Sequence, residues 1–277
     1  IEWYDNSHLV KSEFDINHVD IISLNGRQRN VSLTDDFYWA QPSVSPNGKY
    51  VAFPAVRKSI RKCGVFLLDI KSGKVKKLCD DVVKSYVTWS PDSRKIAYGE
   101  GGYEKKYKLK IIDIETGTIK DTGVNGVGIS WSPDGKWLAF TGDFINGGSW
   151  SYGIPVDGSI SNMNIKTGEV KILTEAGTNI YNENLQYWEI SGAYNPLWSP
   201  NGKKIAYRKS HDISKEGKEK IREDEIWVMN ADGTSKKKLA NGSSRFAWSS
   251  DGKSLMVKID QGIKCIDINN IKSKSIV

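Results

Sequence analysis

Short runs in which apolar and polar residues alternate fill most of the chain, and pairs that contain glycine separate these runs. Residues 66–70 form one such run, which Ser72-Gly73 separates from a second run over 75–78. A period of two predicts β-strands, and glycine after Asp, Asn, Ser or Thr predicts hairpin turns because glycine accepts a positive φ at little cost. A membrane-spanning helix needs roughly 18 apolar residues in a row, and no such run occurs. The pattern therefore predicts an all-β chain without a membrane span.

One longer motif recurs along the chain and organises these strands. Its best copy covers residues 131–140, Trp-Ser-Pro-Asp-Gly-Lys-Trp-Leu-Ala-Phe. Each copy is followed by an alternating run, a tight turn and another run. The wide gap between the copies at Trp131 and Trp198 indicates an insertion rather than a missing copy. The clear copies begin at Val44, Trp89, Trp131, Trp198 and Trp248, and a degraded copy opens the chain at Trp3.

These copies predict a six-bladed β-propeller in which each blade has four antiparallel strands. A unit of two hairpins cannot bury both of its faces alone, whereas neighbouring units of this period bury them against each other. We expect a single propeller domain over residues 1–277, with a loop over 176–189 inserted between two blades. The expected blades are 1–36, 37–81, 82–123, 124–175, 190–240 and 243–277.

The repeat Trp-Ser-Pro-Asp-Gly-Lys-x-Leu-Ala-Phe, with its Asp-Gly or Thr-Gly turn farther along, resembles the TolB-type (PD40) WD40-like propeller repeat over essentially the whole chain. The resemblance implies a bacterial protein that acts outside the cytoplasm, in the periplasm, on the envelope or secreted. It also implies a protein or peptide as the binding partner. Similar repeats form the propellers of prolyl-oligopeptidase-type peptidases, so a gating propeller seen without its catalytic domain is an alternative.

The residues that recur in every copy are expected to build the fold rather than a functional site. Asp92, Asp134 and Asp251 stand in tight turns, where a carboxylate accepts hydrogen bonds from the backbone N–H groups that follow it. The tryptophan before each serine is expected to pack between adjacent blades. Function is therefore expected in the segments that differ between copies.

The long, irregular segments all belong to one class of connection. In a unit of four antiparallel strands, the first and third connections lie at one end, and the second connection and the crossing to the next unit lie at the other. Loops on a rigid scaffold often carry binding residues, so the second end is the expected ligand face. The long segments at this end are 57–62, 100–106, 142–158, 175–195 and 209–224.

Two of these segments, 142–158 and 175–195, mix aromatic residues with Asn, Asp and Glu. Aromatic area and orienting polar groups suit a peptide, with a sugar ring as the alternative ligand, and a local core beneath long loops is the competing interpretation. Residues 210–224 alternate lysine with acidic residues and predict a solvated flap. The candidate ligand-binding residues are Glu100, Asp143, Phe144, Asn146, Trp150, Tyr152, Tyr181, Glu183, Tyr187, Trp188, Tyr194, Arg208 and His211.

Charge and histidine content add no further chemistry. The net charge of +7 comes from scattered lysines without a recognition motif, so no nucleic acid is expected as a partner. His8, His18 and His211 each lack a second ligand at metal-binding spacing, so we expect no metal and no cofactor. The sequence leaves room for Ca²⁺ in a central channel. We expect a monomer.

The three cysteines are expected to be free thiols. If Ser72-Gly73 is the hairpin turn, Cys79 lies opposite Phe66, and Cys63 is three residues farther along the partner strand. That offset exceeds the Cα separation that a disulfide allows.

Residues 150–153, Trp-Ser-Tyr-Gly, echo the nucleophile elbow of dipeptidyl-peptidase-type hydrolases. Ser149 stands where the elbow has glycine, and nothing predicts the α/β sheet that such an elbow requires. We therefore expect no catalytic residue and interpret the chain as a non-catalytic binding scaffold. The alternative is a lyase or glycoside hydrolase with carboxylates at the mouth of the channel, for which the candidates are Glu100, Asp143, Arg208 and His211.

Overall fold

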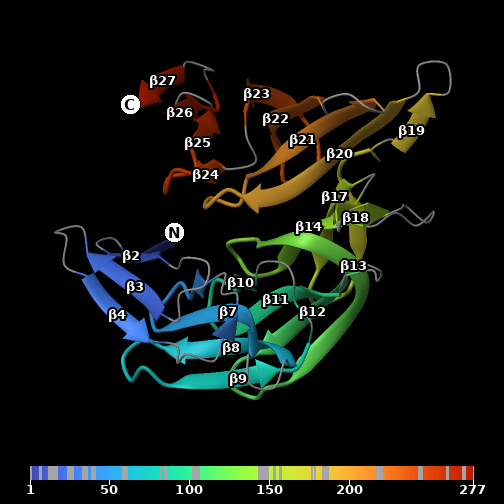
Figure 1. Cartoon of the computed structure of the whole chain (residues 1–277). Coiled ribbons are helices and arrows are strands. Elements are labelled where there is room, and N and C mark those ends of the chain that lie inside the picture. The colour runs from blue at the N-terminus through green and yellow to red at the C-terminus, as the bar shows by residue number, and fades with distance from the viewer. Residues whose placement is uncertain are drawn as a thin grey trace. The chain divides into compact units, whose positions relative to one another are not determined.

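The computed structural model is all-β, with antiparallel strand pairs and no helix in the part of the chain that it describes (Figure 1). Two compact units, Ile1–Val127 and Gly128–Val277, divide the chain. The described residues are 2–5, 8–11, 18–23, 28–32, 37–38, 42–57, 62–81, 83, 87–101, 107–142, 150–151, 154–155, 158–175, 177, 179–182, 187–215, 221–242, 246–259, 262–269 and 273–276. Of these, the residues up to 38 and residues 56–57, 62, 150–155, 179–190, 212–215, 221–222 and 273–276 are described by their backbone alone.

The first unit holds three sheets. The first sheet is β1 (Glu2–Asp5), β2 (His8–Lys11), β3 (His18–Ser23) and β4 (Gln28–Ser32). In the second, β5 (Phe37–Tyr38) and β6 (Ser43–Val44) both pair with β7 (Tyr50–Arg57), which is followed by β8 (Lys62–Asp69) and β9 (Val75–Cys79). The third is β10 (Thr88–Trp89), β11 (Lys95–Glu100), β12 (Lys108–Asp113) and the first part of β13 (Ile119–Trp131).

The second unit begins within β13, whose last residues pair with β14 (Trp137–Gly142). The same sheet continues to β17 (Ser159–Asn164) and β18 (Val170–Ile172), and β15 (Trp150–Ser151) pairs with β16 (Ile154–Pro155). A five-stranded sheet follows, β19 (Asn179–Asn182), β20 (Tyr187–Trp198), β21 (Lys204–Lys215), β22 (Ile221–Asn230) and β23 (Lys237–Asn241). The last sheet is β24 (Phe246–Trp248), β25 (Ser254–Ile259), β26 (Gly262–Asp267) and β27 (Ser273–Ile276).

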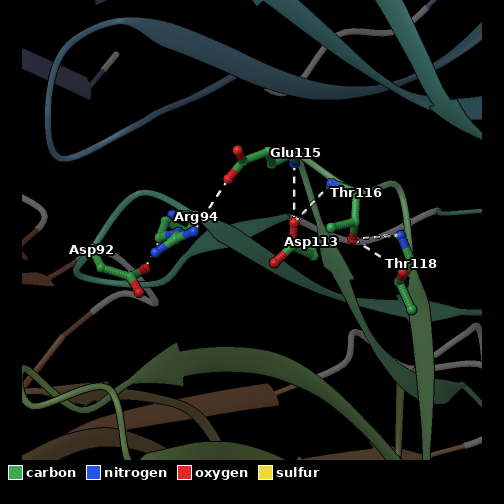
Figure 2. Close-up of polar contacts among 6 residues, drawn as sticks. All are labelled: Asp92, Arg94, Asp113, Glu115, Thr116 and Thr118. Carbon is green, nitrogen blue, oxygen red and sulfur yellow. Dashed lines mark hydrogen bonds and ion pairs between the residues drawn. The ribbon is translucent and has the colours of Figure 1, made fainter.

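The first and third turns of a sheet lie at the same end, as the repeat predicts. In the third sheet Ile114 N donates to Arg94 O at 3.0 Å, which joins the two turns through the main chain. Figure 2 shows the same two turns side by side, with the Arg94 guanidinium 3.1 Å from Glu115 Oε2. The corresponding main-chain bonds in the other sheets are Ile70 N to Lys49 O, Ile165 N to Lys136 O, Ala231 N to Lys203 O and Ile268 N to Lys253 O.

The repeat aspartates accept hydrogen bonds within these turns. Asp134 Oδ1 accepts from Ser132 Oγ at 2.6 Å and from Lys136 N at 3.1 Å. The hydrogen bond from Ser132 and that from the Lys136 N–H hold the pKa of the Asp134 carboxyl below its usual value, although partial burial opposes them. Asn47 Oδ1 makes the same contacts in its copy, so the amide serves as well as the carboxylate. These positions are structural, as predicted.

The repeat tryptophans pack between neighbouring sheets within each unit. Trp89 is buried and its Nε1–H donates to Ser43 O at 2.8 Å, on the preceding sheet. Trp248 Nε1–H donates to Leu197 O at 3.0 Å in the same way. Three buried clusters each draw apolar residues from two sheets, as where Leu67 and Val65 pack with Trp89 and Ile96. A further cluster, around Phe53 and Leu68, lies within the second sheet alone. This packing confirms the predicted role of the tryptophans.

The register of the β8–β9 hairpin differs from the prediction. Cys79 lies opposite Val65 instead of Phe66, because the turn closes with Gly73 N donating to Asp69 O and a bulge follows Val65. All three cysteines are nevertheless free thiols.

Two segments predicted to be loops contain strands. Residues 176–189 include β19 and the first residues of β20, which pair with each other. Residues 209–224 extend β21 and β22 into a long hairpin, with register pairs from Lys204↔Asn230 to Ile213↔Ile221. The predicted flap is therefore a continuation of the five-stranded sheet up to at least residue 215.

Candidate functional site

The predicted ligand-binding residues divide according to what the structure describes. Asp143, Phe144, Asn146, Tyr152 and Glu183 lie outside the described residues. The backbone places Trp150 in β15, Tyr181 in β19, and Tyr187 and Trp188 in β20. Side chains are described for Glu100, Tyr194, Arg208 and His211.

The five-stranded sheet brings several of these positions together by register. Tyr181 lies opposite Trp188, and Asn182 lies opposite Tyr187. Farther along β20, Tyr194 lies opposite Arg208 of β21. Trp150 pairs with Pro155 in the separate β15–β16 sheet. Trp150 and Trp188 lie in different sheets, and their place in one ligand site stays a prediction.

Arg208 is the centre of the described part of this site. Its side chain is buried, with 6% of the residue exposed. The guanidinium carbon lies 5.1 Å from the centroid of the Tyr194 ring, and Nη1 lies 3.6 Å from Asp224 Oδ2. Arginine stays protonated in proteins, so a fixed, planar cation stands here between an aromatic face and a carboxylate.

Glycines shape the space that Tyr194 occupies. A Cβ on Gly192 would lie 2.4 Å from the Tyr194 hydroxyl oxygen, and one on Gly158 would lie 2.7 Å from the ring. Asn195, next in the chain, takes a positive φ of 54°, and its N–H donates to Thr141 Oγ1 at 3.1 Å. The β20–β21 register shifts between Tyr194 and Leu197. The bulge and the small residues together fix the tyrosine ring beside Arg208.

His211 lies one residue beyond Ser210 in the extended hairpin. It is half-buried and lies opposite Ser191 and Glu223 in register. Ser210 is buried and lies opposite Asp224. The sequence named Tyr194, Arg208 and His211 as candidates but not Asp224 or the two glycines. Asp224 lies on β22, which pairs with the strand that carries Arg208. Because the sequence predicted a flap over residues 210–224, this strand was not expected there.

Glu100 belongs to a different cluster, in the first unit. Its Oε2 lies 2.8 Å from Lys110 Nζ, which also lies 3.0 Å from Asp81 Oδ2. The Tyr98 hydroxyl donates to the same Asp81 oxygen at 2.8 Å. Burial raises the pKa of Tyr98. Burial would lower the pKa of Lys110, but the hydrogen bonds to Glu100 and Asp81 outweigh it and raise that pKa. Glu100 therefore belongs to an ion-pair network between strands, and its role in ligand binding stays a prediction.

A cavity of about 410 Å³ adjoins the five-stranded sheet, lined in part by Glu175, Ser191, Lys209 and Trp227. Lys209 Nζ lies 5.5 Å from the centroid of the Trp227 indole, whose Nε1–H donates to Glu225 Oε2 at 2.8 Å. Lys238 pairs with the other oxygen of Glu225, and these contacts lower the pKa of this carboxyl against the opposing effect of burial. The long sheet therefore offers both a basic aromatic cavity and the Arg208 cluster.

Metal and membrane chemistry add little to this picture. Across the described ranges, no three His, Cys, Asp or Glu side chains gather closely enough to hold a metal ion. The same ranges hold no helix of the length and hydropathy that crossing a bilayer would need.

Comparison with known proteins identifies the fold. No protein-family model and no curated protein matches the chain. Among solved structures, TolB from Acinetobacter baumannii superposes with a TM-score of 0.64 at 16% identity, covering 96% of this chain and 62% of that one. A protein of Agrobacterium tumefaciens that carries the name TolB gives a TM-score of 0.61 at 18% identity, covering 87% and 79%.

A protease is also similar in structure. The tricorn protease gives a TM-score of 0.64 at 12% identity, and the chain covers 30% of its length. The match covers 100% of this chain. At these identities the likeness carries the fold alone, and the chain has a TolB-like β-propeller fold. It spans about three fifths of the A. baumannii TolB, 62% of that chain.

Proposed function

We propose that this chain is a non-catalytic, six-bladed propeller scaffold that binds a protein or peptide through the end opposite its tight turns. The supporting observation is the Arg208 cluster, a buried cation held against Tyr194 and Asp224 on the longest hairpin of the described sheets. A preformed surface of this kind recognises a partner without rearranging the strands that carry it.

The chemistry of the cluster favours recognition over catalysis. An arginine that remains charged cannot transfer protons, whereas its planar donors match a carboxylate or a row of main-chain carbonyls. The aromatic positions of β19 and β20 lie on the same sheet, at Tyr181, Tyr187 and Trp188. Aromatic residues with arginine are the typical anchors of a protein interface. A peptide with an acidic residue or a free C-terminus is the ligand that this combination suits best.

The place of action follows from the fold likeness in this proposal. The TolB-like fold favours a partner in the cell envelope or outside the cell, with the chain acting as a monomer outside the cytoplasm. A sugar ring is the alternative ligand for the aromatic strands.

A second candidate is the non-catalytic propeller of a larger peptidase. It is favoured by the likeness to a puromycin-hydrolysing peptidase of Mycobacterium tuberculosis, with a TM-score of 0.62 at 10% identity over 98% of this chain and 45% of that one. In that case the same end would face a catalytic domain, and the chain would act as its gate.

The test is selection of peptides from a random library on the immobilised chain, followed by calorimetric titration of the selected peptides. Arg208→Lys and Trp188→Ala should weaken binding at least about tenfold, while Lys166→Ala, an exposed change in a tight turn, should not. Equal binding by all three variants would remove the proposed surface. Turnover of a glycoside, polyuronate or peptide panel, lost in Asp143→Ala, would replace the scaffold with the enzyme alternative.

A further inference from the structure

A second cavity, of about 700 Å³, opens between two neighbouring sheets of the second unit at their tight-turn end. Residues of β14, β17 and β20 line it, and both β14 and β17 contact β20. Its volume is in the range of small-molecule sites. The residues used below are Asp134, Trp137, Asn162, Trp198, Asn201 and Asp232, all of which line it.

Asn162 is a polar residue at a position that is apolar in three other sheets. It lies opposite Ala139 in the β14–β17 register. The equivalent pairs in other sheets are Leu67↔Ala52, Ile111↔Ala97 and Val228↔Ala206. Leu67 and Val228 fill buried clusters between sheets, whereas Asn162 lines the cavity. The asparagine is therefore an exception to the packing of those three sheets, although Asp20 holds the equivalent place opposite Lys11 in the first sheet.

The amide of Asn162 is only half satisfied. The residue is 4% exposed, and its Nδ2 donates to Ala231 O at 3.2 Å on the facing sheet. Its Oδ1 is buried and makes no hydrogen bond. Burying an acceptor without a partner costs the free energy of removing that atom from water, so such a group calls for an explanation.

Trp198 presents a matching donor. It is 8% exposed and lines the same cavity, and its Nε1–H makes no hydrogen bond. The corresponding indoles of Trp89 and Trp248 both donate to a main-chain carbonyl of the preceding sheet. At this interface the Trp198 main-chain N donates to Ser130 Oγ at 3.1 Å instead.

The cavity is framed by contacts that keep the two sheets apart at a fixed spacing. Lys171 Nζ donates to Asp232 O at 2.9 Å on one side. On the other, a Cβ on Gly202 would lie 3.8 Å from Pro133 Cδ. In the first unit the positions equivalent to Trp137 and Trp198 are Tyr50 and Trp89, whose rings stack at 6.4 Å. A ring-shaped guest can use the space that Trp137 and Trp198 line.

We propose that this cavity binds a neutral saccharide ring of mono- or disaccharide size. The apolar face of a pyranose packs on indole rings, and each hydroxyl both donates and accepts. One hydroxyl can therefore satisfy the Trp198 donor and another the Asn162 acceptor, which an apolar guest cannot do. This site is separate from the proposed peptide surface and does not depend on it.

The rim selects for a neutral guest. Hydrogen bonds from the Ser132 side chain and the Lys136 N–H lower the pKa of Asp134, and those from Thr234 lower the pKa of Asp232. Both are acceptors at neutral pH and favour hydroxyl donors over anions. The Lys171 ammonium on this rim already donates to Asp232 O.

The test follows the indole resonances of the ¹⁵N-labelled chain, which has 10 tryptophans. The probes are methyl β-D-glucopyranoside, methyl β-D-galactopyranoside, N-acetylglucosamine, maltose and cellobiose, with galacturonate as the anionic control. The Trp198 indole N–H, assigned with Trp198→Phe, should shift with at least one neutral probe at a Kd in the millimolar range or below. Galacturonate should bind more weakly than its neutral counterpart.

Asn162→Leu, which restores the residue type of the other sheets, should weaken binding at least about tenfold and raise the unfolding midpoint. Asn241→Leu, an exposed change on β23, should leave both the affinity for the probes and the unfolding midpoint unchanged. Should Asn162→Leu not fold, Trp198→Phe carries the same test because it removes the donor together with part of the ring, and binding is then followed at the Trp137 indole, which also lines the cavity. A Trp198 resonance that moves with no probe, as in a cavity filled by water only, overturns the proposal. Binding that is unchanged in both variants, Asn162→Leu and Trp198→Phe, also overturns the proposal.

Discussion

The guanidinium carbon of Arg208 lies 5.1 Å from the centroid of the Tyr194 ring, on the strand directly opposite, and both residues are buried. Asp224 completes the group from the next strand, 3.6 Å from the same guanidinium. Three neighbouring strands therefore each contribute one residue to a single charged cluster. Its geometry depends on the planar shape of the arginine, because an ammonium cannot stack and reach a carboxylate in the same way.

Arg208→Met should destabilise the chain more than Arg208→Lys. The methionine leaves Asp224 largely buried without its cation, with an expected loss of about 3 kcal/mol, whereas lysine retains the charge and should cost about 1–2 kcal/mol. Urea unfolding of both variants measures the difference. Adding Asp224→Asn to Arg208→Met should recover part of the loss, and a double variant no more stable than the single one would contradict the pairing.

The Lys110 network in the first unit makes a parallel prediction about Glu100. Lys110→Met should cost about 2–4 kcal/mol because it leaves both Asp81 and Glu100 without their shared cation. Glu100→Gln should cost less, since Asp81 still pairs with the ammonium and Glu100 is the more exposed partner. The ranking is read from denaturant midpoints. If Glu100→Gln were instead the more damaging change, Glu100 would have a role beyond this ion pair.

Ser93 takes the position that glycine holds in the other repeat turns, with a φ of 59° beside 68° at both Gly48 and Gly135. Its Oγ accepts from Asn47 N at 3.0 Å on the neighbouring sheet, which compensates for the strained backbone. Ser93→Ala keeps the strain and loses the bond, so we expect a loss of about 1–2 kcal/mol. Ser93→Gly exchanges the bond for relief of strain and should be close to neutral. Thermal unfolding of the pair decides this, and an alanine variant as stable as the glycine variant would refute it.

The turns could be predicted from the sequence because they are short, local and repeated. Ser-Pro-Asp-Gly specifies its own hydrogen bonds within a few residues, as Ser132 and Asp134 show. The β8–β9 register differs from the prediction by two residues at the turn, where Leu68 lies opposite Val75, and the bulge after Val65 reduces the difference to one at Cys79. Neither the length of the turn nor the bulge leaves a mark in the alternation. Sequence patterns fix the existence of a hairpin better than its register.

The extended hairpin was missed for a different reason. A half-buried strand is recognised in a sequence by its alternation of apolar and polar residues. Residues 210–224 are rich in charged side chains and do not show this alternation clearly. The main-chain pairing from Ser210↔Asp224 to Ile213↔Ile221 holds the segment in the sheet regardless. Asn162, by contrast, was detectable, since aligning the repeats places it among Leu67, Ile111 and Val228.

Acid should weaken the fold through the repeat aspartates. Hydrogen bonds hold the pKa of Asp134 below its usual 3.8, so the folded state binds the proton less readily than the unfolded one. The stability that this carboxylate contributes is therefore complete above pH 3.8 and is lost as the pH falls through the lowered folded-state pKa. Asp134→Asn should flatten that dependence and cost less than about 1 kcal/mol at pH 7, because the side chain is largely exposed and Asn47 fills the same role elsewhere. Unfolding midpoints from pH 2 to 7 test this. A variant whose midpoint falls with acid as steeply as that of the original chain would contradict it.

The two buried indoles at Trp89 and Trp198 allow a matched comparison that needs no ligand. Both are nearly inaccessible, at 6% and 8% exposure, but only the Trp89 indole has a carbonyl partner among the described contacts, Ser43 O at 2.8 Å. Phenylalanine removes similar apolar area at each site, yet Trp89→Phe also takes a donor from the carbonyl of the half-buried Ser43, whereas Trp198→Phe deletes a donor that bonds to nothing. We therefore expect Trp89→Phe to cost about 1 kcal/mol more than Trp198→Phe in urea unfolding. Equal losses would mean that the Trp198 N–H is satisfied in solution, by water or by the neighbouring sheet, and the cavity would then lose its free donor.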